Sequence, residues 1–195
     1  YLADCFGLRL LNRRGCFPQF DKLIEQTKDV WTHLVDIRKS FEPRAEELAK
    51  KYALAPYTMF IGSGALWGET ILFSMCILEE MQWKRTRYIT SADFFHGTLE
   101  LVEPGVPVFL FMGEDENRKL DERVRAFLTR GVTGDTDINI IDTAEFAIPG
   151  LDDEFRVIVS PWILTVLVTD RLARYYETVT KHNLKYRRYY HQFDY

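Results

Sequence analysis

Short apolar segments alternate with longer helical patterns through the middle of this 195-residue chain. Residues 57–61 (YTMFI) and 106–112 (VPVFLFM) are almost wholly apolar, which is typical of strands buried on both faces of a sheet. Weaker strand patterns cover residues 88–90 and 138–141. Helical patterns lie between and after the strands, at residues 65–82, 116–130 and 155–182. This alternation predicts an α/β protein with a parallel sheet covered by helices on both faces.

The first 54 residues carry helical patterns only. Residues 18–39 have apolar side chains at helical spacing, and residues 42–52 follow as a second helix with Pro43 near its first turn. Residues 1–11 begin inside an amphipathic helical pattern, without an initiator Met or an N-cap. We therefore expect a fragment whose N-terminal part is missing, with a helical segment at 1–54 and an α/β module at 55–195.

Charge and cysteine usage narrow the class of protein. A formal net charge of −4 offers no concentrated basic face, so nucleic acid is not an expected partner. The longest apolar run, residues 157–168, is interrupted by polar residues and proline and is too short to cross a bilayer. Cys5, Cys16 and Cys76 have no CxxC spacing, which indicates buried thiols in a reducing compartment. We expect a cytoplasmic protein with no membrane span, disulfide framework or metal site.

The C-terminal stretch differs from the rest because it is both basic and aromatic. Its residues of these two kinds are Lys181, Lys185, Tyr186, Arg187, Arg188, Tyr189 and Tyr190. Such interleaving can bind single-stranded nucleic acid by stacking. A short cationic tail more often pairs with an acidic surface or an anionic metabolite, and we favour that interpretation.

A glycine-rich turn follows the first predicted strand. Gly62, Ser63 and Gly64 lie between that strand and a helix, where backbone N–H groups can face an anion. Ligands of parallel sheets commonly bind outside the carboxyl ends of the strands. Many such turns use glycine for geometry alone, so both roles remain open here. The chain has no GxGxxG or Walker sequence, and we expect no cofactor.

Two further stretches carry groups suited to acid–base chemistry. Glu79 and Glu80 close the helical pattern that follows the glycine-rich turn, although acidic residues near a helix C-terminus are electrostatically unfavourable. His96 follows the next strand among Phe94 and Phe95, which predicts a partly buried loop. A solvated helix end and a structural histidine are the alternatives to a catalytic pair.

The order of these motifs resembles the second module of the sugar-isomerase (SIS) family. The shared order is Gly62-Ser63-Gly64, a helix ending in glutamate, a strand, and then Asp93-Phe94-Phe95-His96-Gly97. Glu80 and His96 are sixteen residues apart, which is the family's spacing between its catalytic glutamate and histidine. The likeness is clear over residues 57–112. It implies a three-layer α/β/α fold of flavodoxin-like type with a short, mainly parallel sheet, preceded by helices and closed by a long C-terminal helix.

The resemblance also implies roles for particular residues. Glu80 corresponds to the general base and His96 to the group that opens the sugar ring and moves protons. The aminating isomerases have a lysine where this chain has Ile77, so the chain looks closer to the deglycases. These enzymes split 6-phosphorylated fructose–amino acids (Amadori compounds) into glucose 6-phosphate and the free amino acid. Among them, the 6-phosphofructose-aspartate deglycases look closer than the fructoselysine 6-phosphate deglycases.

The rest of the site lies outside the matched motifs. In the family, the loops that grip the phosphate belong to the first SIS module, for which residues 1–54 would be the connection. A homodimer with a shared active site is implied as well. Arg187, Arg188 and His191 are candidates to cover the pocket or bind the amino-acid carboxylate, with a packed surface tail as the alternative. Two other functions remain open: an SIS-type aldose–ketose isomerase and a sugar-phosphate-binding module without turnover.

Overall fold

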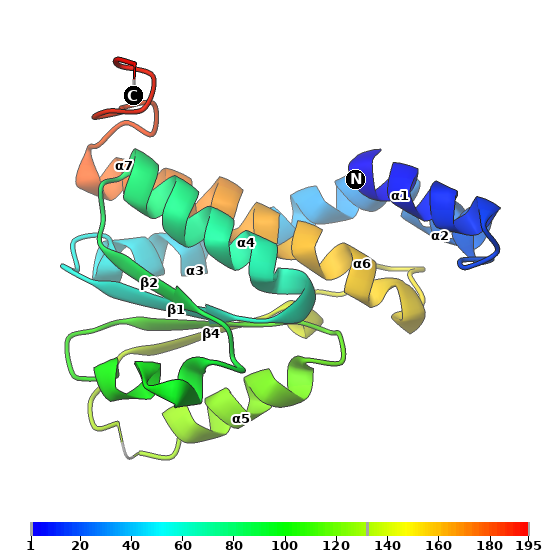
Figure 1. The fold of residues 1–195 in the computed structure, drawn as a ribbon. Helices are drawn as coiled ribbons and strands as arrows, with labels where there is room; N and C mark the ends of the chain where they lie inside the picture. The colour runs from blue at the N-terminus through cyan, green and yellow to red at the C-terminus, as the bar shows by residue number, and fades with distance from the viewer. Residues whose placement is uncertain (1, 132, 195) are drawn as a thin grey trace.

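The computed structural model describes residues 2–131 and 133–194. At its centre is a four-stranded parallel sheet with the strand order β2-β1-β3-β4 (Figure 1). The strands are β1 (Thr58–Gly62), β2 (Thr86–Ile89), β3 (Val108–Met112) and β4 (Ile138–Asp142). In register, Thr58 pairs with Thr86 and Ile61 with Ile89 across β1 and β2. The parallel sheet predicted from the alternating pattern is confirmed.

The position of each strand in the sheet follows from its composition. Strands β1 and β3 are buried at every residue, as central strands covered on both faces must be. Strand β2 lies at an edge, is only partly buried, and begins two residues before the predicted 88–90. Thr86 and Arg87 belong to the strand because they pair with β1. Both are polar, so a search for apolar residues does not find them.

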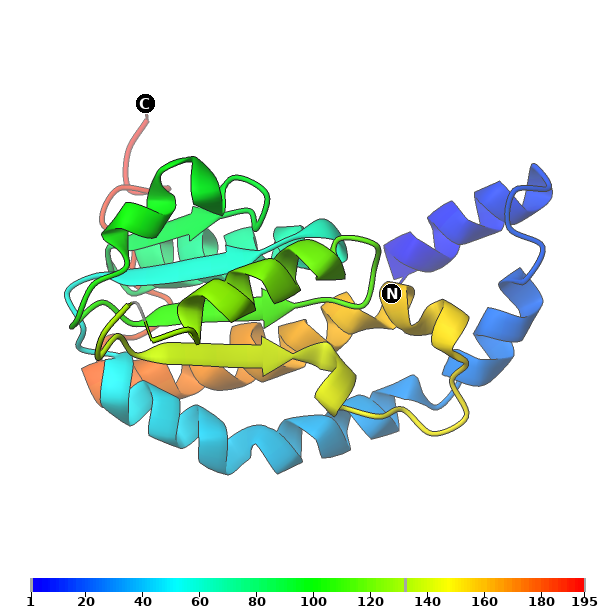
Figure 2. The same cartoon turned by 90° about the horizontal axis from the view of Figure 1, so that it is seen from below.

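Helices cover both faces of the sheet and complete the three-layer fold (Figure 2). On one face, the larger core contains Phe60, Phe109 and Phe111 from the sheet. The helices on this face are α3 (Val30–Tyr52), α4 (Trp67–Ile71), η2 (Leu72–Met81), α6 (Asp153–Leu164), η6 (Thr165–Leu172) and α7 (Ala173–Thr180). The opposite face has a smaller core under α5 (Arg118–Leu128), η3 (Phe94–His96) and η4 (Thr98–Leu101). Two more short helical turns, η1 (Gly64–Leu66) and η5 (Thr143–Glu145), follow β1 and β4.

The helices of the N-terminal part differ from the sequence prediction. Helix α2 (Phe20–Thr27) ends early, and α3 runs unbroken from Val30 to Tyr52 with Pro43 in its interior. The predicted break at residues 40–41 is therefore wrong. Proline removes one helical hydrogen bond, but the buried stripe of α3, which includes Leu34 and Phe41, packs mainly against η6 and α7 and keeps the helix continuous.

The predicted helical segments at residues 65–82 and 155–182 are confirmed, and each contains a π-helical stretch. Helix α4 continues into η2, and α6 continues through η6 into α7. The two π-helical stretches contact each other. Their wider turns do not follow the 3.6-residue period, so the sequence pattern could not show them. π-Helical turns are frequent at functional sites.

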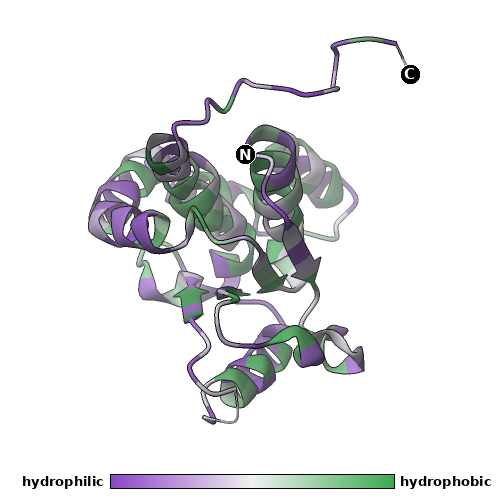
Figure 3. Ribbon diagram, turned by 90° about the vertical axis from the view of Figure 1, so that its left-hand side faces the viewer, coloured by the Kyte–Doolittle hydropathy of each residue, from purple (hydrophilic) through white to green (hydrophobic). Residues whose placement is uncertain are grey.

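The ends of the chain lie at opposite ends of the sheet (Figures 1 and 2). Helix α1 (Leu2–Arg13) has no buried residue, and Tyr1 of the predicted first helix lies outside the described residues. Beyond α7 the chain continues as a largely hydrophilic tail, which Figure 3 shows leaving the helical layer. Tyr195, the last residue of that tail, also lies outside the described residues.

Burial of the three thiols was predicted incorrectly. Cys16 is exposed in the turn between α1 and α2, and Cys5 and Cys76 are partly exposed. All three are free. Among residues 2–131 and 133–194, no helix has the length and apolar composition needed to cross a membrane.

Candidate active site

The end of η2 carries Glu79 and Glu80 to the amino end of β2. The helix closes through hydrogen bonds from the Trp83 N–H to the Glu79 carbonyl (3.1 Å) and from the Lys84 N–H to the Leu78 carbonyl (2.8 Å). Trp83 has a left-handed backbone conformation, with φ of 54°. That position usually belongs to glycine, and a side chain there costs about 1 kcal/mol. The strained turn places an indole beside the two glutamates.

The two adjacent glutamates have different partners. Glu79 accepts a 2.6 Å hydrogen bond from the Thr86 hydroxyl at the start of β2, which ties the helix end to the sheet. Glu80 forms a 2.8 Å ion pair with Nε of Arg187 from the C-terminal tail. The Glu80 side chain is 36% exposed and that of Arg187 is 19% exposed, so this pair lies in a half-open site. Glu80 is therefore not a freely solvated helix end.

The tail is held over the helix end by two contacts with Trp83. The His182 ring lies edge-on to the Trp83 indole with centroids 4.3 Å apart, and the Arg188 guanidinium lies 4.3 Å from the same ring. Nη1 of Arg187 donates to the carbonyls of Leu184 (2.8 Å) and Tyr186 (2.9 Å). These backbone contacts fix the guanidinium while its Nε faces Glu80.

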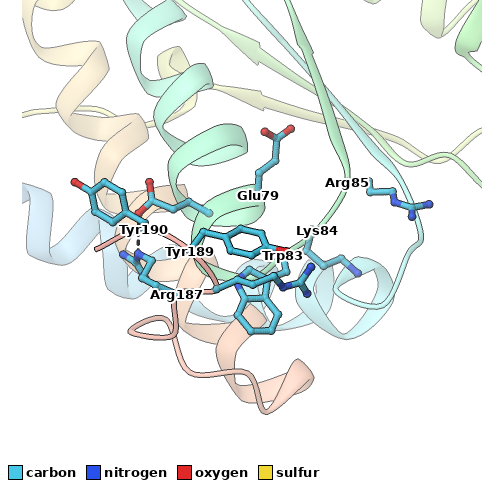
Figure 4. Close-up of a pocket in the computed structure, with 9 residues that line it drawn as sticks. Glu79, Trp83, Lys84, Arg85, Arg187, Tyr189 and Tyr190 are labelled. Carbon is cyan, nitrogen blue, oxygen red and sulfur yellow. Dashed lines mark ion pairs between the residues drawn. The ribbon is translucent and has the colours of Figure 1, made fainter. Parts of the chain in front are cut away.

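Helix end and tail together enclose a cavity of about 540 Å³ (Figure 4). Its lining includes four cationic side chains and two carboxylates: Lys84, Arg85, Arg187, Arg188, Glu79 and Glu80. Trp83, Tyr189 and Tyr190 supply the aromatic walls. Burial lowers the pKa of Lys84, as expected for an ammonium group that has lost water. The cavity therefore has an excess of positive charge around a glutamate.

Of the predicted tail residues, Arg187 and Arg188 line this cavity and His191 does not. His191 is exposed, and its ring lies against Tyr190 with centroids 4.1 Å apart. Three lining residues were missed in the sequence: Trp83, Lys84 and Arg85. The signal that could have found them is an aromatic and basic cluster that begins three residues after Glu80.

His96 lies elsewhere in the fold, at the carboxyl end of β2. It is exposed, although its aromatic neighbours predicted partial burial. Phe94 is the fully buried residue of η3, and it packs with Phe95 and Phe127 on the α5 face. Helix η2 packs on the other face of the sheet. The four residues of β2, about 13 Å of extended chain, also separate Glu80 from His96. The structure does not bring these two side chains together within one chain.

The glycine-rich turn lies at the carboxyl end of β1 and is filled by internal contacts. Ser63 is buried, and its hydroxyl accepts a 2.8 Å hydrogen bond from the Ser91 N–H. Gly64 has φ of +55°. The Asp115 carboxylate accepts from the backbone N–H groups of Ala65 and Asn117. An internal anion thus occupies the helix N-terminus where the sequence suggested an external one.

The cleft beside this turn is acidic. Its volume is about 640 Å³, and its lining contains five carboxylate side chains: Glu114, Asp115, Glu116, Asp153 and Glu154. Glu114 is paired with Arg156 and Glu154 with Lys22, and repulsion from the other three carboxylates disfavours a phosphate or carboxylate ligand here. Across residues 2–131 and 133–194, no group of three or more His, Cys, Asp or Glu side chains is placed to hold a metal ion.

A buried carboxyl group, Asp121, supports the carboxyl end of the sheet. Its Oδ1 accepts a 2.5 Å hydrogen bond from the Ser91 hydroxyl, and Oδ2 accepts a 3.4 Å bond from the Gly113 N–H. Burial raises its pKa to about 6. Asp121 could not be singled out in the sequence because most of its neighbours in the helix are charged as well. The available signal was its place on the same helical stripe as Val124 and Leu128.

Comparisons with known proteins agree with this fold. No family model matches the chain. It is 28% identical over 188 residues to the fructosamine deglycase of Bacillus subtilis, covering 94% of this chain and 54% of the relative. It is 27% identical over 195 residues to the fructoselysine 6-phosphate deglycase of Escherichia coli, covering 97% and 54%. A structure assigned to a phosphosugar isomerase of Salmonella typhimurium superposes with a TM-score of 0.85 at 26% identity, over 96% of this chain and 57% of that one.

These matches confirm the resemblance to SIS-type sugar-phosphate enzymes that the motif order suggested. The chain spans about half the length of the curated relatives it matches.

Proposed function

We propose that this chain is the second SIS module of a fructosamine 6-phosphate deglycase, with residues 1–54 as the connection to the first module and Glu80 as the general base. The observation that carries the proposal is the half-open cavity at the end of η2, in which Glu80 is surrounded by an excess of cations. Similarity to two deglycases over nearly the whole chain supports the reaction class.

The proposed reaction moves one proton between neighbouring carbons and then hydrolyses an imine. The substrate has a ketone at C2 and a secondary amine on C1. Glu80 removes a C1 proton while the ketone oxygen takes up a proton, so that the C1–C2 enaminol forms, and Glu80 then returns its proton at C2. The double bond now lies between C1 and nitrogen as a protonated imine, and addition of water releases the aldehyde of glucose 6-phosphate, the free amine and the proton gained at the ketone oxygen. A well-placed base contributes about 10²–10⁴-fold to such a step.

The Arg187–Glu80 ion pair gives the tail a part in this chemistry. The Arg187 guanidinium lies against Oε1 of Glu80, so its displacement would free the whole carboxylate to take the C1 proton. Substrate entry therefore moves Arg187 off Glu80 and leaves the guanidinium free for an anionic group of the substrate. Arg188, which rests on Trp83, and Lys84, whose pKa is lowered by burial, offer further positive charge.

The charge of the cavity bears on which amine is released. Four cationic side chains and two carboxylates line the cavity, so two positive charges have no counter-charge among the described lining residues. An amino acid with more than one carboxylate matches this lining better than one with a cationic side chain. We therefore favour 6-phosphofructose-aspartate over fructoselysine 6-phosphate as the substrate.

His96 enters the proposal through a second copy of the chain. Glu80 and His96 lie at opposite ends and on opposite faces of the sheet, so one chain cannot place both on one sugar. A homodimer in which His96 of one subunit completes the Glu80 site of the other would satisfy the chemistry. The cytoplasm remains the expected compartment, based on the free thiols.

The test uses the full-length protein with 6-phosphofructose-aspartate, following glucose 6-phosphate release with a coupled dehydrogenase. Glu80→Gln is expected to lower kcat by about 10³-fold or more, because the amide cannot accept the proton. Glu79→Gln is the matched control and should stay within about five-fold, since its amide oxygen can still accept from Thr86. A large loss in the Glu79 variant alone would transfer the base to Glu79. Equal activity of all three proteins would overturn the assignment of either glutamate.

One observation favours a second candidate, an aldose–ketose isomerase. The Salmonella typhimurium structure is assigned to a phosphosugar isomerase, and the enaminol step has the same proton transfer as an enediol step. Ile77, where the aminating isomerases have lysine, is buried in the larger core and does not line the cavity. Product analysis with fructose 6-phosphate and with the Amadori compound separates the two reactions.

A further inference from the structure

Lys84 differs from every other lysine of the chain in its burial. All the lysines lie within the described residues, and all except Lys84 are exposed. Several of the exposed ones, such as Lys22 and Lys51, pair with carboxylates. Neither the Lys84 ammonium nor the neighbouring Arg85 guanidinium forms an ion pair with a described carboxylate. Lys84 has therefore been partly buried without gaining a counter-ion from the described chain.

The local structure does not account for the position of this charge. A lysine can bury its alkyl stem while its ammonium group stays in water. Here burial lowers the pKa of Lys84 and is the sole cause of the shift, so the ammonium group itself has lost water. The turn after η2 uses the backbone N–H of Lys84, which donates to the Leu78 carbonyl, and makes no use of the side chain. A partly desolvated cation without a partner is costly to the fold.

The cavity places Lys84 away from the catalytic end. Figure 4 shows Lys84 and Arg187 on opposite sides of the cavity, with Trp83 and Tyr189 between them. Arg187 is paired with Glu80, whereas the charge of Lys84 is uncompensated. A ligand that spans the cavity with its reacting end at Glu80 therefore meets Lys84 at its other end.

We infer that Lys84 binds an oxyanion group of the ligand, a phosphate or a carboxylate, at the end of the cavity away from Glu80. An ammonium group is a compact charge with three donors, and it forms charge-assisted hydrogen bonds with either group. The inference rests on the proposed function for the identity of the substrate, whose 6-phosphate and amino-acid side chain are two sources of such an anion. Lys84 then governs how tightly the substrate binds, and Glu80 governs the proton transfer.

The first test measures binding without turnover. The full-length protein is titrated at constant ionic strength with inorganic phosphate and, separately, with succinate. NMR follows the indole N–H resonance of Trp83, which a Trp83→Phe variant assigns. At least one of the anions is expected to shift this resonance saturably, with a Kd in roughly the millimolar range. Tighter binding of phosphate identifies the 6-phosphate as the source of the anion, and tighter binding of succinate identifies a carboxylate.

Three variants assign the anion to Lys84. Lys84→Met keeps a long stem without the charge and should weaken binding by about ten-fold. Lys84→Arg keeps the charge and should stay within about three-fold of wild type. Lys119→Met removes an exposed lysine on α5 and should leave the Kd unchanged. Lys84→Met should also unfold at the wild-type temperature or above it, because it removes a poorly solvated charge.

Kinetics then connect the anion to the substrate. With 6-phosphofructose-aspartate, Lys84→Met should raise KM by about ten-fold and change kcat by less than about three-fold. An equal rise with the alanine analogue, which has one carboxylate fewer, points to the phosphate. A rise confined to the aspartate compound points to the side-chain carboxylate.

Two results would overturn the inference: no saturable shift with either anion up to about 100 mM, or an unchanged Kd for both anions in Lys84→Met. A different result separates it from the proposed function. If the wild-type protein binds an anion through Lys84 but releases no glucose 6-phosphate, the proposed reaction is wrong and the anion site at Lys84 stands.

Discussion

The two ends of the parallel sheet carry opposite charge. At the amino end, the cavity beside Glu80 has four cationic side chains and two carboxylates. At the carboxyl end, the cleft beside Gly64 is lined by five carboxylates and no cation. The carboxyl ends of β1 and β3, where the strand order reverses, are the usual place for a ligand in a sheet of this kind.

This contrast teaches that topology alone does not locate the site for an anionic substrate. The helix N-terminus after β1 has the geometry to bind an anion, but the Asp115 carboxylate already accepts from its backbone N–H groups. The amino end lacks this favourable helix terminus and compensates with arginine and lysine side chains. The topology favours a ligand at the carboxyl end of the sheet, whereas the charge favours a sugar phosphate at the amino end.

The largest expected effect comes from testing whether Glu80 of one subunit and His96 of another share one active site. Full-length Glu80→Ala and His96→Ala are each expected to lose most activity, because each lacks one proton-transfer group. Mixed subunits regain one intact site in each heterodimer, so random mixing should restore about a quarter of wild-type activity. Release of glucose 6-phosphate from co-refolded variants measures this recovery.

Absence of recovery in verified heterodimers would show that Glu80 and His96 do not meet across subunits. Activity of His96→Ala close to wild type would instead remove His96 from the site altogether. Only this second result would confine the chemistry to the amino end of the sheet.

The next effect concerns Asp121, the buried acidic side chain near the carboxyl ends of the strands. Asp121 faces Ser91, with Asp115 and Arg118 as its charged neighbours, and burial raises its pKa to about 6. A proton is therefore bound more tightly in the folded state than in the unfolded one. The stability it contributes is present below the unfolded pKa near 3.8 and is lost as pH rises through about 6.

Asp121→Asn cannot ionise and should remove this dependence. Relative to the variant, the wild-type free energy of unfolding should fall by about 2 kcal/mol between pH 4 and pH 7.5. Urea unfolding at several pH values measures the difference. A difference that stays constant with pH would mean that Asp121 is as well solvated when folded as when unfolded.

A smaller effect is expected from reversing charge at each end in turn. Arg188→Glu places a carboxylate on Trp83 inside the cationic cavity and should raise KM for the anionic substrate by about ten-fold, more at low salt. Glu116→Lys is the matched change in the acidic cleft and should alter KM by less than about two-fold. The opposite ranking would place the substrate at the carboxyl end.

The sequence predicted the fold more completely than the site. Residues 57–61 and 106–112 are apolar throughout, so their central positions could be read directly, and the motif order led to Glu80. The sequence made Arg187 a candidate to cover the pocket, but its ion pair with Glu80 could not be predicted, because the two residues are more than a hundred positions apart and no local period relates them. Asp115 is also out of reach for sequence reasoning, since only the folded loop shows that it occupies the helix N-terminus.

The smallest expected effects come from two glycines four residues apart. Gly64 has φ of +55°, and a Cβ there would overlap the Asp115 carboxylate. Gly64→Ala should therefore destabilise the protein by about 1–2 kcal/mol. Gly68 lies in α4 with open space where its Cβ would be, so Gly68→Ala should stabilise by about 0.5–1 kcal/mol. Urea unfolding of both variants measures the two signs. If Gly64→Ala is neutral, the turn tolerates a side chain, Asp115 can leave the helix N-terminus, and an external anion could take its place at the carboxyl end.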